Sequence, residues 1–200
     1  MDKIKLKTNN QIGKITFHHP KANCLSGETI NNLIKLLERA DKDPKTKVIL
    51  IQSEGSKAFC SGASLEGLKK ISTINQALSF FMDFSNLINT IRKLSKFVIA
   101  RVHGPSVGGG VGLISACDYV FACKQASVRL SELSLGLGPY VIEPAISRKI
   151  GTTNFAELSL DSKDWKSSKW AKEKGLFNNI SESIDQMDVE IEKKISFFCF

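Results

Sequence analysis

The sequence predicts a single α/β domain whose later part is mainly helical. Short apolar runs alternate with longer amphipathic stretches, which is typical of strands alternating with helices. The chain has 200 residues and 42% hydrophobic content, enough to bury one core. A glycine-rich turn joins an apolar run to a helical stretch, and no linker, low-complexity tract or repeat divides the chain.

Six strands are expected. Residues 4–8 and 12–17 alternate polar and apolar side chains around the Asn9-Asn10 turn, and this pattern predicts a β-hairpin. The other four are short, mainly apolar runs, as expected of strands buried on both faces. They cover residues 48–52, 97–102, 119–122 and 127–130.

Helices are expected where apolar residues recur every three or four positions or follow a glycine-rich turn. The expected helices cover residues 28–40, about 74–94, and 111–117. After Pro144 the pattern is mostly helical, with interruptions at Gly151 and Gly175. A last helical pattern covers residues 187–200.

Composition and charge exclude several functional classes. The net charge of +8 suits an anionic partner such as a phosphate-bearing cofactor. The basic residues are scattered, so we expect no nucleic-acid partner. No apolar run is long enough to span a bilayer, and the N-terminus has neither a signal core nor transit-peptide character. The five cysteines lack metal-ligand spacing, so we expect no metal and a cytoplasmic protein.

The glycine-rich segment at residues 104–112 is compatible with several kinds of site. A phosphate-binding loop would need a lysine where Gly110 stands. Residues 104–108 match the G-x-S-x-G nucleophile elbow, but every histidine precedes Ser106, whereas such hydrolases place the triad histidine after the serine. Two interpretations remain open on this segment alone: an oxyanion hole built from backbone amides, or a tight turn with close packing.

A second segment, residues 58–66, also follows a buried strand and opens a helical stretch. With the triple glycine, it completes a set of motifs that resembles the crotonase (enoyl-CoA hydratase/isomerase) family. The family pattern is P-x-x-N-A-L, F-x-x-G-A-D-L, N-G-x-x-x-G-G-G, A-C-D and P-E-x-x-L-G. Its counterparts here are residues 20–25, 59–65, 103–110, 116–118 and 131–136, in the family's order and spacing. The resemblance covers about residues 4–180.

The resemblance implies roles for individual residues. The amides of Ala63 and Gly109 are expected to form the oxyanion hole for a thioester oxygen, and Glu132 to be the general acid/base. Two positioned donors on a developing enolate contribute roughly 3 kcal/mol each. The expected substrate-binding residues are Ala22, Cys24, Ala58, Ser61, Gly62, Ser64, Leu65, Gly108 and Leu133.

Two departures from the family pattern bear on the reaction. Gly112 stands where many hydratases of the family carry a first glutamate, so Glu132 is left as the sole carboxylate, and Ser64 replaces a common aspartate. The run from 130 to 151 is most similar to methylglutaconyl-CoA hydratases of leucine breakdown. The first hypothesis is hydration of a short or branched 2-enoyl-CoA. The alternatives are an isomerase or decarboxylase that uses one glutamate, or a non-catalytic acyl-CoA-binding subunit.

The resemblance also implies the architecture and the partners. The expected fold is a crotonase-like (ClpP/crotonase) ββα superhelix, with a core at residues 1–180 and the start of a C-terminal helical region at 181–200. Coenzyme A is expected as the carrier of the substrate, with no permanently bound cofactor, and a homotrimer or hexamer as the assembly. Relative to the family the chain is shortened at its C-terminus, and we expect Phe197, Phe198 and Phe200 to form a sticky apolar end.

Overall fold

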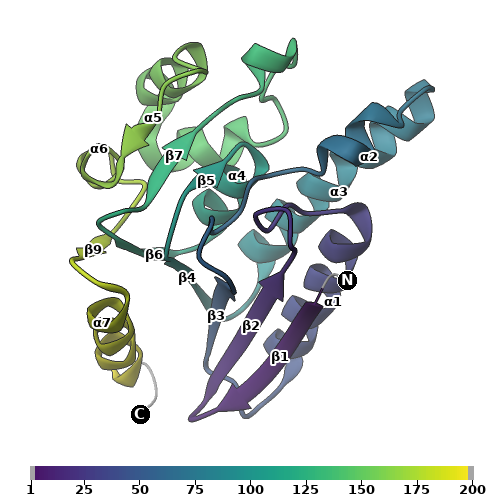
Figure 1. The fold of residues 1–200 in the computed structure, drawn as a ribbon. Coiled ribbons are helices and arrows are strands. Elements are labelled where there is room, and N and C mark those ends of the chain that lie inside the picture. Colours follow the sequence, from purple (N-terminus) through teal and green to yellow (C-terminus); the bar gives the residue numbers. More distant parts are fainter. Residues whose placement is uncertain (1–2, 198–200) are drawn as a thin grey trace.

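The computed structural model describes residues 3–197, arranged around a six-stranded sheet (Figure 1). Across this sheet the strands are β1 (Lys3–Asn9), β2 (Ile12–His18), β3 (Val48–Ser53), β4 (Phe97–Val102), β6 (Tyr119–Cys123) and β9 (Asn179–Ser181). Only β1 runs antiparallel to its neighbour. A smaller sheet contains β5 (Ser106–Val107), β7 (Ser127–Arg129) and β8 (Lys166–Ser167).

Seven α-helices and one 3-10 turn connect the strands within the described residues. They are α1 (Gly27–Lys42), α2 (Leu65–Lys69), α3 (Ile74–Lys93), α4 (Gly109–Ala116), η1 (Leu133–Leu135), α5 (Glu143–Leu160), α6 (Ser168–Glu173) and α7 (Ile184–Ser196). Side chains cap several of their N-termini: the Ser26 hydroxyl accepts from the Thr29 amide at the start of α1, and the Thr73 hydroxyl accepts from the Gln76 amide at the start of α3.

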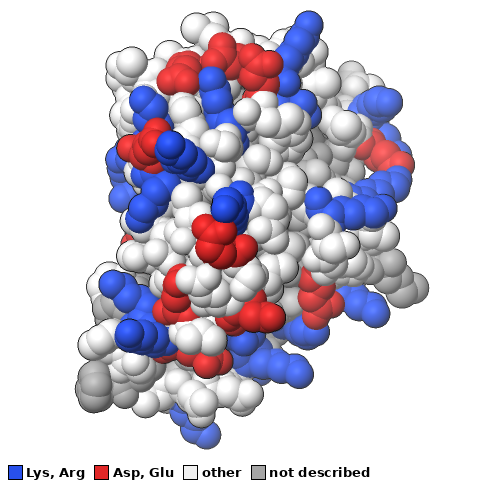
Figure 2. Space-filling view, turned by 60° about the vertical axis from the view of Figure 1, so that its left-hand side comes forward, with Lys and Arg blue, Asp and Glu red and all other residues white. Residues whose placement is uncertain are grey.

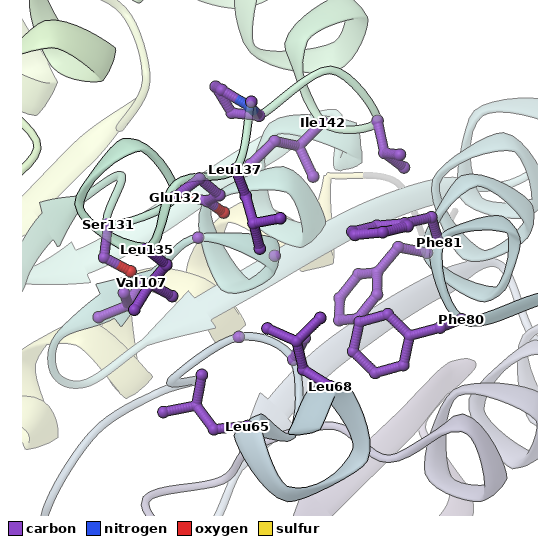
Figure 3. A pocket seen from close by; sticks show the side chains of 18 of the residues that line it. Leu65, Leu68, Phe80, Phe81, Val107, Ser131, Glu132, Leu135, Leu137 and Ile142 are labelled. Carbon is purple, nitrogen blue, oxygen red and sulfur yellow. The ribbon is translucent and has the colours of Figure 1, made fainter. Parts of the chain in front are cut away.

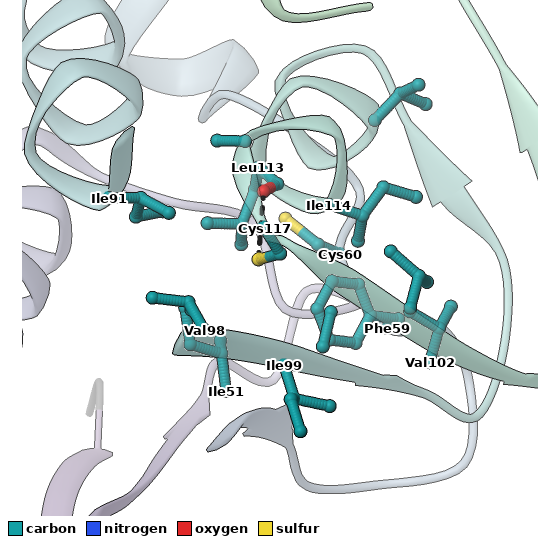
Figure 4. Packing of buried hydrophobic residues seen from close by; sticks show 14 of the residues in the cluster. Ile51, Phe59, Cys60, Ile91, Val98, Ile99, Val102, Leu113, Ile114 and Cys117 are labelled. Carbon is teal, nitrogen blue, oxygen red and sulfur yellow. Dashed lines mark hydrogen bonds between the residues drawn. The ribbon is translucent and has the colours of Figure 1, made fainter. Parts of the chain in front are cut away.

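The core lies between the sheet and the helices α1, α3 and α4 (Figure 4). Every residue of α4 is buried, so this helix is apolar all round and runs through the interior. In Figure 4, Ile51 of β3 and Val98 of β4 lie on the face of the sheet that is turned toward α4, which contributes Leu113 and Ile114. Each such side chain, when fully buried, contributes roughly 1.5–3 kcal/mol. Packing of this kind holds α4 in the interior of the molecule.

The sequence predicted most of these elements. The hairpin, the helix near 28–40, the long helix near 74–94 and the buried strands all form within a few residues of their expected ends. The helix expected at 111–117 begins earlier, at Gly109, and Gly151 breaks the helical geometry of α5 with a φ of 77°. The very short strands β5, β8 and β9 were not predicted, because two or three residues carry too little periodicity to detect.

The C-terminal part of the described chain continues the main sheet. β9 pairs with β6, and α7 packs on both strands. The predicted boundary at residue 180 falls inside β9, and the division into two regions stays a prediction. Phe198 and Phe200 lie outside the described residues, whereas Phe197 is exposed at the end of α7.

Charged side chains of both signs are interspersed on the face of the molecule shown in Figure 2, without a large area of one sign. Within residues 3–197, no helix combines the length and the apolar content that crossing a membrane requires.

Candidate active site

Three loops follow the carboxyl ends of β2, β3 and β4, which are neighbouring parallel strands. Such loops meet at one edge of a sheet, where ligand sites of α/β proteins commonly lie. Here they are joined by hydrogen bonds. The Val107 amide donates to the Cys60 carbonyl at 2.9 Å, and the Leu25 amide donates to the Gly62 carbonyl at 2.8 Å. The loop after β3, which contains Cys60 and Gly62, is therefore held by hydrogen bonds to the loops on both sides of it.

The Ala63 amide is left free to face a ligand. Leu25 bridges to Ala63 as in a parallel sheet, and the bonds that make this bridge use the Gly62 carbonyl and the Ser64 amide. In an extended segment, successive amides point to opposite sides. The N–H of Ala63 therefore points away from Leu25, and among the described residues it donates no hydrogen bond.

The Gly109 amide is the second donor, at the first residue of α4. Helix starts carry unsatisfied N–H groups and a partial positive charge, and the Gly109 N–H has no acceptor within residues 3–197. Gly62 brings the two donors together: a Cβ at Gly62 would lie 2.7 Å from the Val107 oxygen and 3.1 Å from the Gly109 nitrogen. The loop of Ala63 is thus in van der Waals contact with the start of α4.

Glu132 lies directly beside the second donor. A Cβ at Gly108 would sit 2.5 Å from Glu132 Oε1, so only glycine leaves room for the carboxylate there. Gly108 also has a φ of +51°, a region that favours glycine. The Glu132 backbone is held by its carbonyl, which accepts from the amides of Leu135 and Leu137 at 2.9 and 3.0 Å.

Burial sets the protonation behaviour of this carboxylate. Oε2 of Glu132 is buried and has no hydrogen-bond partner among the described residues. Loss of hydration raises the pKa of Glu132 above its ordinary value of 4.5, although its own amide and that of Ser131 partly oppose the rise. A carboxyl with a raised pKa is suited to exchange protons with a substrate near neutral pH.

The walls of the cavity are apolar (Figure 3). Its volume is about 90 Å³. Figure 3 shows Phe80 and Phe81 of α3 on one side, Leu65 and Leu68 of α2 below, and the loop after β7 opposite. The lining residues are Ser61, Gly62, Ala63, Leu65, Leu68, Phe80, Phe81, Phe84, Val107, Gly108, Gly109, Ser131, Glu132, Leu135, Leu137, Gly138, Pro139, Val141 and Ile142. Amides and a carboxylate in such surroundings interact strongly with developing charge.

The structure brings all three predicted catalytic residues, Ala63, Gly109 and Glu132, into this one cavity. Of the predicted substrate-binding residues, those that line it are Ser61, Gly62, Leu65 and Gly108. The others do not line it: Ala22, Cys24, Ala58, Ser64 and Leu133. Contacts of these five residues with a CoA group stay predictions.

The five predicted substrate-binding residues that do not line the cavity have other positions and contacts in the structure. Ala22 accepts from the Ser61 amide, and Cys24 is buried beside His19. The Ala58 carbonyl accepts from the side chain of Asn23. The Ser64 hydroxyl caps α2 by accepting from the Gly67 amide, and Leu133 is 43% exposed on η1.

Sequence reasoning missed the aromatic wall on α3. Phe80, Phe81 and Phe84 line the cavity, and Phe84 packs on Gly109, where a Cβ would lie 2.3 Å from its ring. The signal was three phenylalanines within five positions, but an amphipathic helix predicts only that one face is buried. Periodicity does not say what that face contacts.

At Gly112, where the family resemblance leads one to expect a first glutamate, the neighbouring space is occupied by another side chain. A Cβ at Gly112 would lie 2.5 Å from Ile142 Cγ2, so the Ile142 side chain occupies the space into which a side chain at 112 would extend. No other acidic side chain lines the cavity within the described part of the chain. The same part of the chain holds no group of three or more His, Cys, Asp or Glu side chains placed to bind a metal ion.

Two comparisons with known proteins concern the sequence. The family model described as enoyl-CoA hydratase/isomerase matches residues 7–194. A Bacillus subtilis protein named "Probable enoyl-CoA hydratase" is 29% identical, over 79% of this chain and 61% of its own length. A peroxisomal Delta(3,5)-Delta(2,4)-dienoyl-CoA isomerase of Arabidopsis thaliana is 30% identical, over 92% of this chain and 70% of its own.

The chain spans only part of other relatives. It matches 38% of the length of a mitochondrial 3-hydroxyisobutyryl-CoA hydrolase of Danio rerio, with 32% identity over 70% of this chain. Among solved structures, an enoyl-CoA hydratase of Mycobacterium smegmatis superimposes with a TM-score of 0.92 at 25% identity, covering 98% of this chain and 76% of that one. The predicted crotonase-like α/β fold is thereby confirmed.

Proposed function

The chain belongs to the enoyl-CoA hydratase/isomerase family, and on that premise we propose that it binds an acyl-CoA thioester and stabilises the enolate of that thioester. The thioester oxygen would accept hydrogen bonds from the Ala63 and Gly109 amides, and Glu132 would exchange a proton with the substrate. The observation that carries this proposal is the meeting of two unsatisfied amides and one buried carboxylate in a single apolar cavity.

The chemical logic follows from where charge develops. Removing or adding a proton at the carbon next to a thioester places negative charge on the thioester oxygen. Amides already aimed at that oxygen stabilise the charge without reorganisation, typically by about 3 kcal/mol each. The start of α4 adds a positive field at Gly109. Glu132 lies against Gly108, next to the Gly109 amide. The carboxylate that exchanges the proton would therefore lie close to the thioester oxygen on which the negative charge develops.

The first candidate reaction is syn addition of water to a short or branched 2-enoyl-CoA. Glu132 would activate the water and then protonate the α-carbon. Within this class of substrate, the sequence likeness to methylglutaconyl-CoA hydratases favours 3-methylglutaconyl-CoA and a place in leucine breakdown, whereas the apolar lining of the cavity favours an acyl group without a charge. The hydratase relative in Bacillus subtilis supports this reaction type.

The second candidate is movement of a double bond, in which Glu132 carries a proton between two carbons. The position of Ile142 favours it. A water molecule held for attack needs more than one polar partner, and Ile142 fills the space where a second carboxylate would extend. The isomerase relative in Arabidopsis thaliana supports this second reaction type.

The decisive experiment compares the protein with its Glu132→Gln variant. We expect the variant to lose turnover while its affinity for acyl-CoA stays within about tenfold, because the oxyanion donors remain. Full activity in the variant would remove Glu132 from the mechanism. Exchange of α-protons in deuterium oxide separates an enzyme from a non-catalytic binder. Incorporation of oxygen from heavy-oxygen water then separates hydration from isomerisation.

The remaining parts of the proposal concern the setting of the reaction. Coenzyme A would arrive and leave with the substrate, without a permanently bound cofactor. We propose a homotrimer or hexamer in the cytoplasm, as the family resemblance suggests. Sedimentation equilibrium tests the assembly directly, and a mass of one chain at all concentrations would contradict it.

A further inference from the structure

We propose that the cavity selects acyl groups that carry no charge and excludes those that end in a carboxylate. This inference rests on the proposed function, because it names the substrates that the same site accepts. It would disfavour a 3-methylglutaconyl group, which bears a terminal carboxylate, and would favour short apolar enoyl groups.

The first observation is the chemistry of the cavity walls. Apart from Glu132, the lining residues with polar side chains are Ser61 and Ser131, and the Ser61 hydroxyl already donates to the Lys21 carbonyl. No lysine, arginine or histidine of residues 3–197 lines the cavity. A carboxylate loses its hydration on entering such a site and finds no cation to replace it, which is strongly unfavourable.

The second observation is the charge already present. When Glu132 is ionised, a second carboxylate in the same apolar cavity is repelled by it, and low-dielectric surroundings strengthen that repulsion. The buried Oε2 of Glu132 has no partner in the described chain that would neutralise it. An acyl carboxylate would also raise the pKa of Glu132 further, leaving less of the ionised form for proton transfer.

The third observation concerns shape. Phe84 packs against Gly109, and Ile142 packs against Gly112, so apolar side chains cover one face of the first turn of α4 and form part of the cavity wall. Figure 3 shows Phe80, Phe81 and Leu68 facing the same space. Aromatic and aliphatic walls gain free energy when apolar carbons displace water from them. The same walls therefore favour the acyl group that the charge argument allows.

The experiment compares two acyl-CoA molecules of equal chain length, pentanoyl-CoA and glutaryl-CoA. Their CoA groups are identical, so their affinities differ only through the end of the acyl chain. We expect calorimetry to show pentanoyl-CoA binding at least about a hundredfold more tightly, given the cost of desolvating an unpaired carboxylate. Exchange of the α-protons in deuterium oxide, measured for both, gives an independent readout.

A set of variants tests whether the absence of a cation in the cavity wall causes the selection. Phe81→Lys places a cation at the cavity wall and should bring glutaryl-CoA at least about tenfold closer to pentanoyl-CoA. Phe81→Met controls for loss of the ring. Met82→Lys adds the same charge at the next position, which is 45% exposed and does not line the cavity, and should leave the ratio unchanged.

The outcomes are distinguishable. Equal binding of the two ligands by the unmodified protein, with α-proton exchange in both, would overturn the charge selection and leave the proposed function standing. Binding of neither ligand, without exchange, would overturn the proposed function and this inference with it. A shift in Met82→Lys as large as that in Phe81→Lys would place the selection outside the cavity and would also overturn it.

Discussion

Missing Cβ atoms shape this site at the scale of single residues. At Gly62, Gly108 and Gly109, an added Cβ would fall within 3.0 Å of a carbonyl oxygen, of the Glu132 carboxylate and of the Phe84 ring, respectively. Real Cβ atoms do not approach other atoms that closely, so each of these glycines allows one specific contact. Ala63, Gly109 and Glu132, the proposed donors and base, are neighbours because these contacts exist.

A pair of double variants isolates the Gly109 amide. Any side chain at position 109 overlaps the ring of Phe84, so both variants also carry Phe84→Leu, which replaces the ring by a smaller side chain. We then compare Gly109→Pro/Phe84→Leu with Gly109→Ala/Phe84→Leu. Both carry a Cβ, and proline is tolerated at the first position of a helix, but only proline lacks the N–H. We expect the proline variant to turn over at least about a hundredfold more slowly.

Circular dichroism must first show that both double variants are folded. Equal rates in two folded variants would mean that the thioester oxygen is bound elsewhere.

The raised pKa of Glu132 predicts how stability depends on pH. Because the folded-state pKa lies above the ordinary value of 4.5, the folded protein binds this proton more tightly than the unfolded chain. The stability that the protonated Glu132 carboxyl contributes is fully present below the unfolded-state pKa and is lost as the pH rises through the folded-state pKa. Glutamine at position 132 does not ionise, so the Glu132→Gln variant keeps its stability over this pH range. Its melting temperature should therefore exceed that of the parent at pH 7. The difference should shrink toward pH 4.5.

Thermal melts across this pH range provide the measurement. Glu38→Gln, at an exposed position in the C-terminal half of α1, is the matched control and should show no such convergence. A parent protein that is more stable than Glu132→Gln at pH 7 would contradict the prediction.

At the scale of elements, the packing of α4 against the start of α5 decides how many carboxylates the site can hold. Ile142 precedes α5 and projects onto Gly112 in α4. This contact closes the space that a first glutamate would need. Whether the site can hold a second carboxylate therefore depends on how α4 packs against the residue before α5, and not on the residue at position 112 alone.

We predict that Gly112→Glu alone destabilises the protein by about 1–3 kcal/mol, because the new side chain overlaps Ile142. Adding Ile142→Ala should restore part of that stability, since it empties the space. If a second carboxylate can hold the attacking water, the double variant should also incorporate more oxygen from heavy-oxygen water per turnover than the parent does.

Gly112→Gln/Ile142→Ala has the same size without the charge and serves as the control. Equal incorporation in the two double variants would show that the added carboxylate does not position water. Chemical denaturation checks the stability part independently.

At the scale of the whole molecule, several large apolar side chains remain exposed. They include Leu78 and Met82 on α3 and Phe197 at the end of α7. Exposed apolar area of this kind is typical of surfaces that associate with another chain. The burial of Ile191 and Ile195 shows that α7 itself docks on the core, while Phe197 is 67% exposed.

We predict that the protein self-associates through the end of α7, and that Phe197→Ser weakens the association. Light scattering across a concentration series should show a lower average mass for this variant. Val189→Ser is the matched control, because Val189 is 65% exposed on the same helix. Truncation before Ile195 is a poorer test, since it would remove a buried side chain and destabilise the fold. A monomer in every case would contradict the prediction.

Local patterns in the sequence determined the main strands and the long helices, and they singled out Ala63, Gly109 and Glu132 as the proposed donors and base. Strand and helix periodicity is visible over a few residues, and the motifs around Ala63, Gly109 and Glu132 are contiguous in the chain. The family resemblance then assigned them roles. These inferences needed no knowledge of which distant residues touch.

Only the tertiary structure decided which side chains line the candidate site. The contact of Gly62 with Gly109, the filling of the space at Gly112 by Ile142 and the aromatic wall of α3 all join residues that are far apart in the chain. Such contacts depend on how whole elements pack, and packing is set by the complementarity of many side chains at once. A pattern along the chain records which residues are apolar, but not which of them face each other.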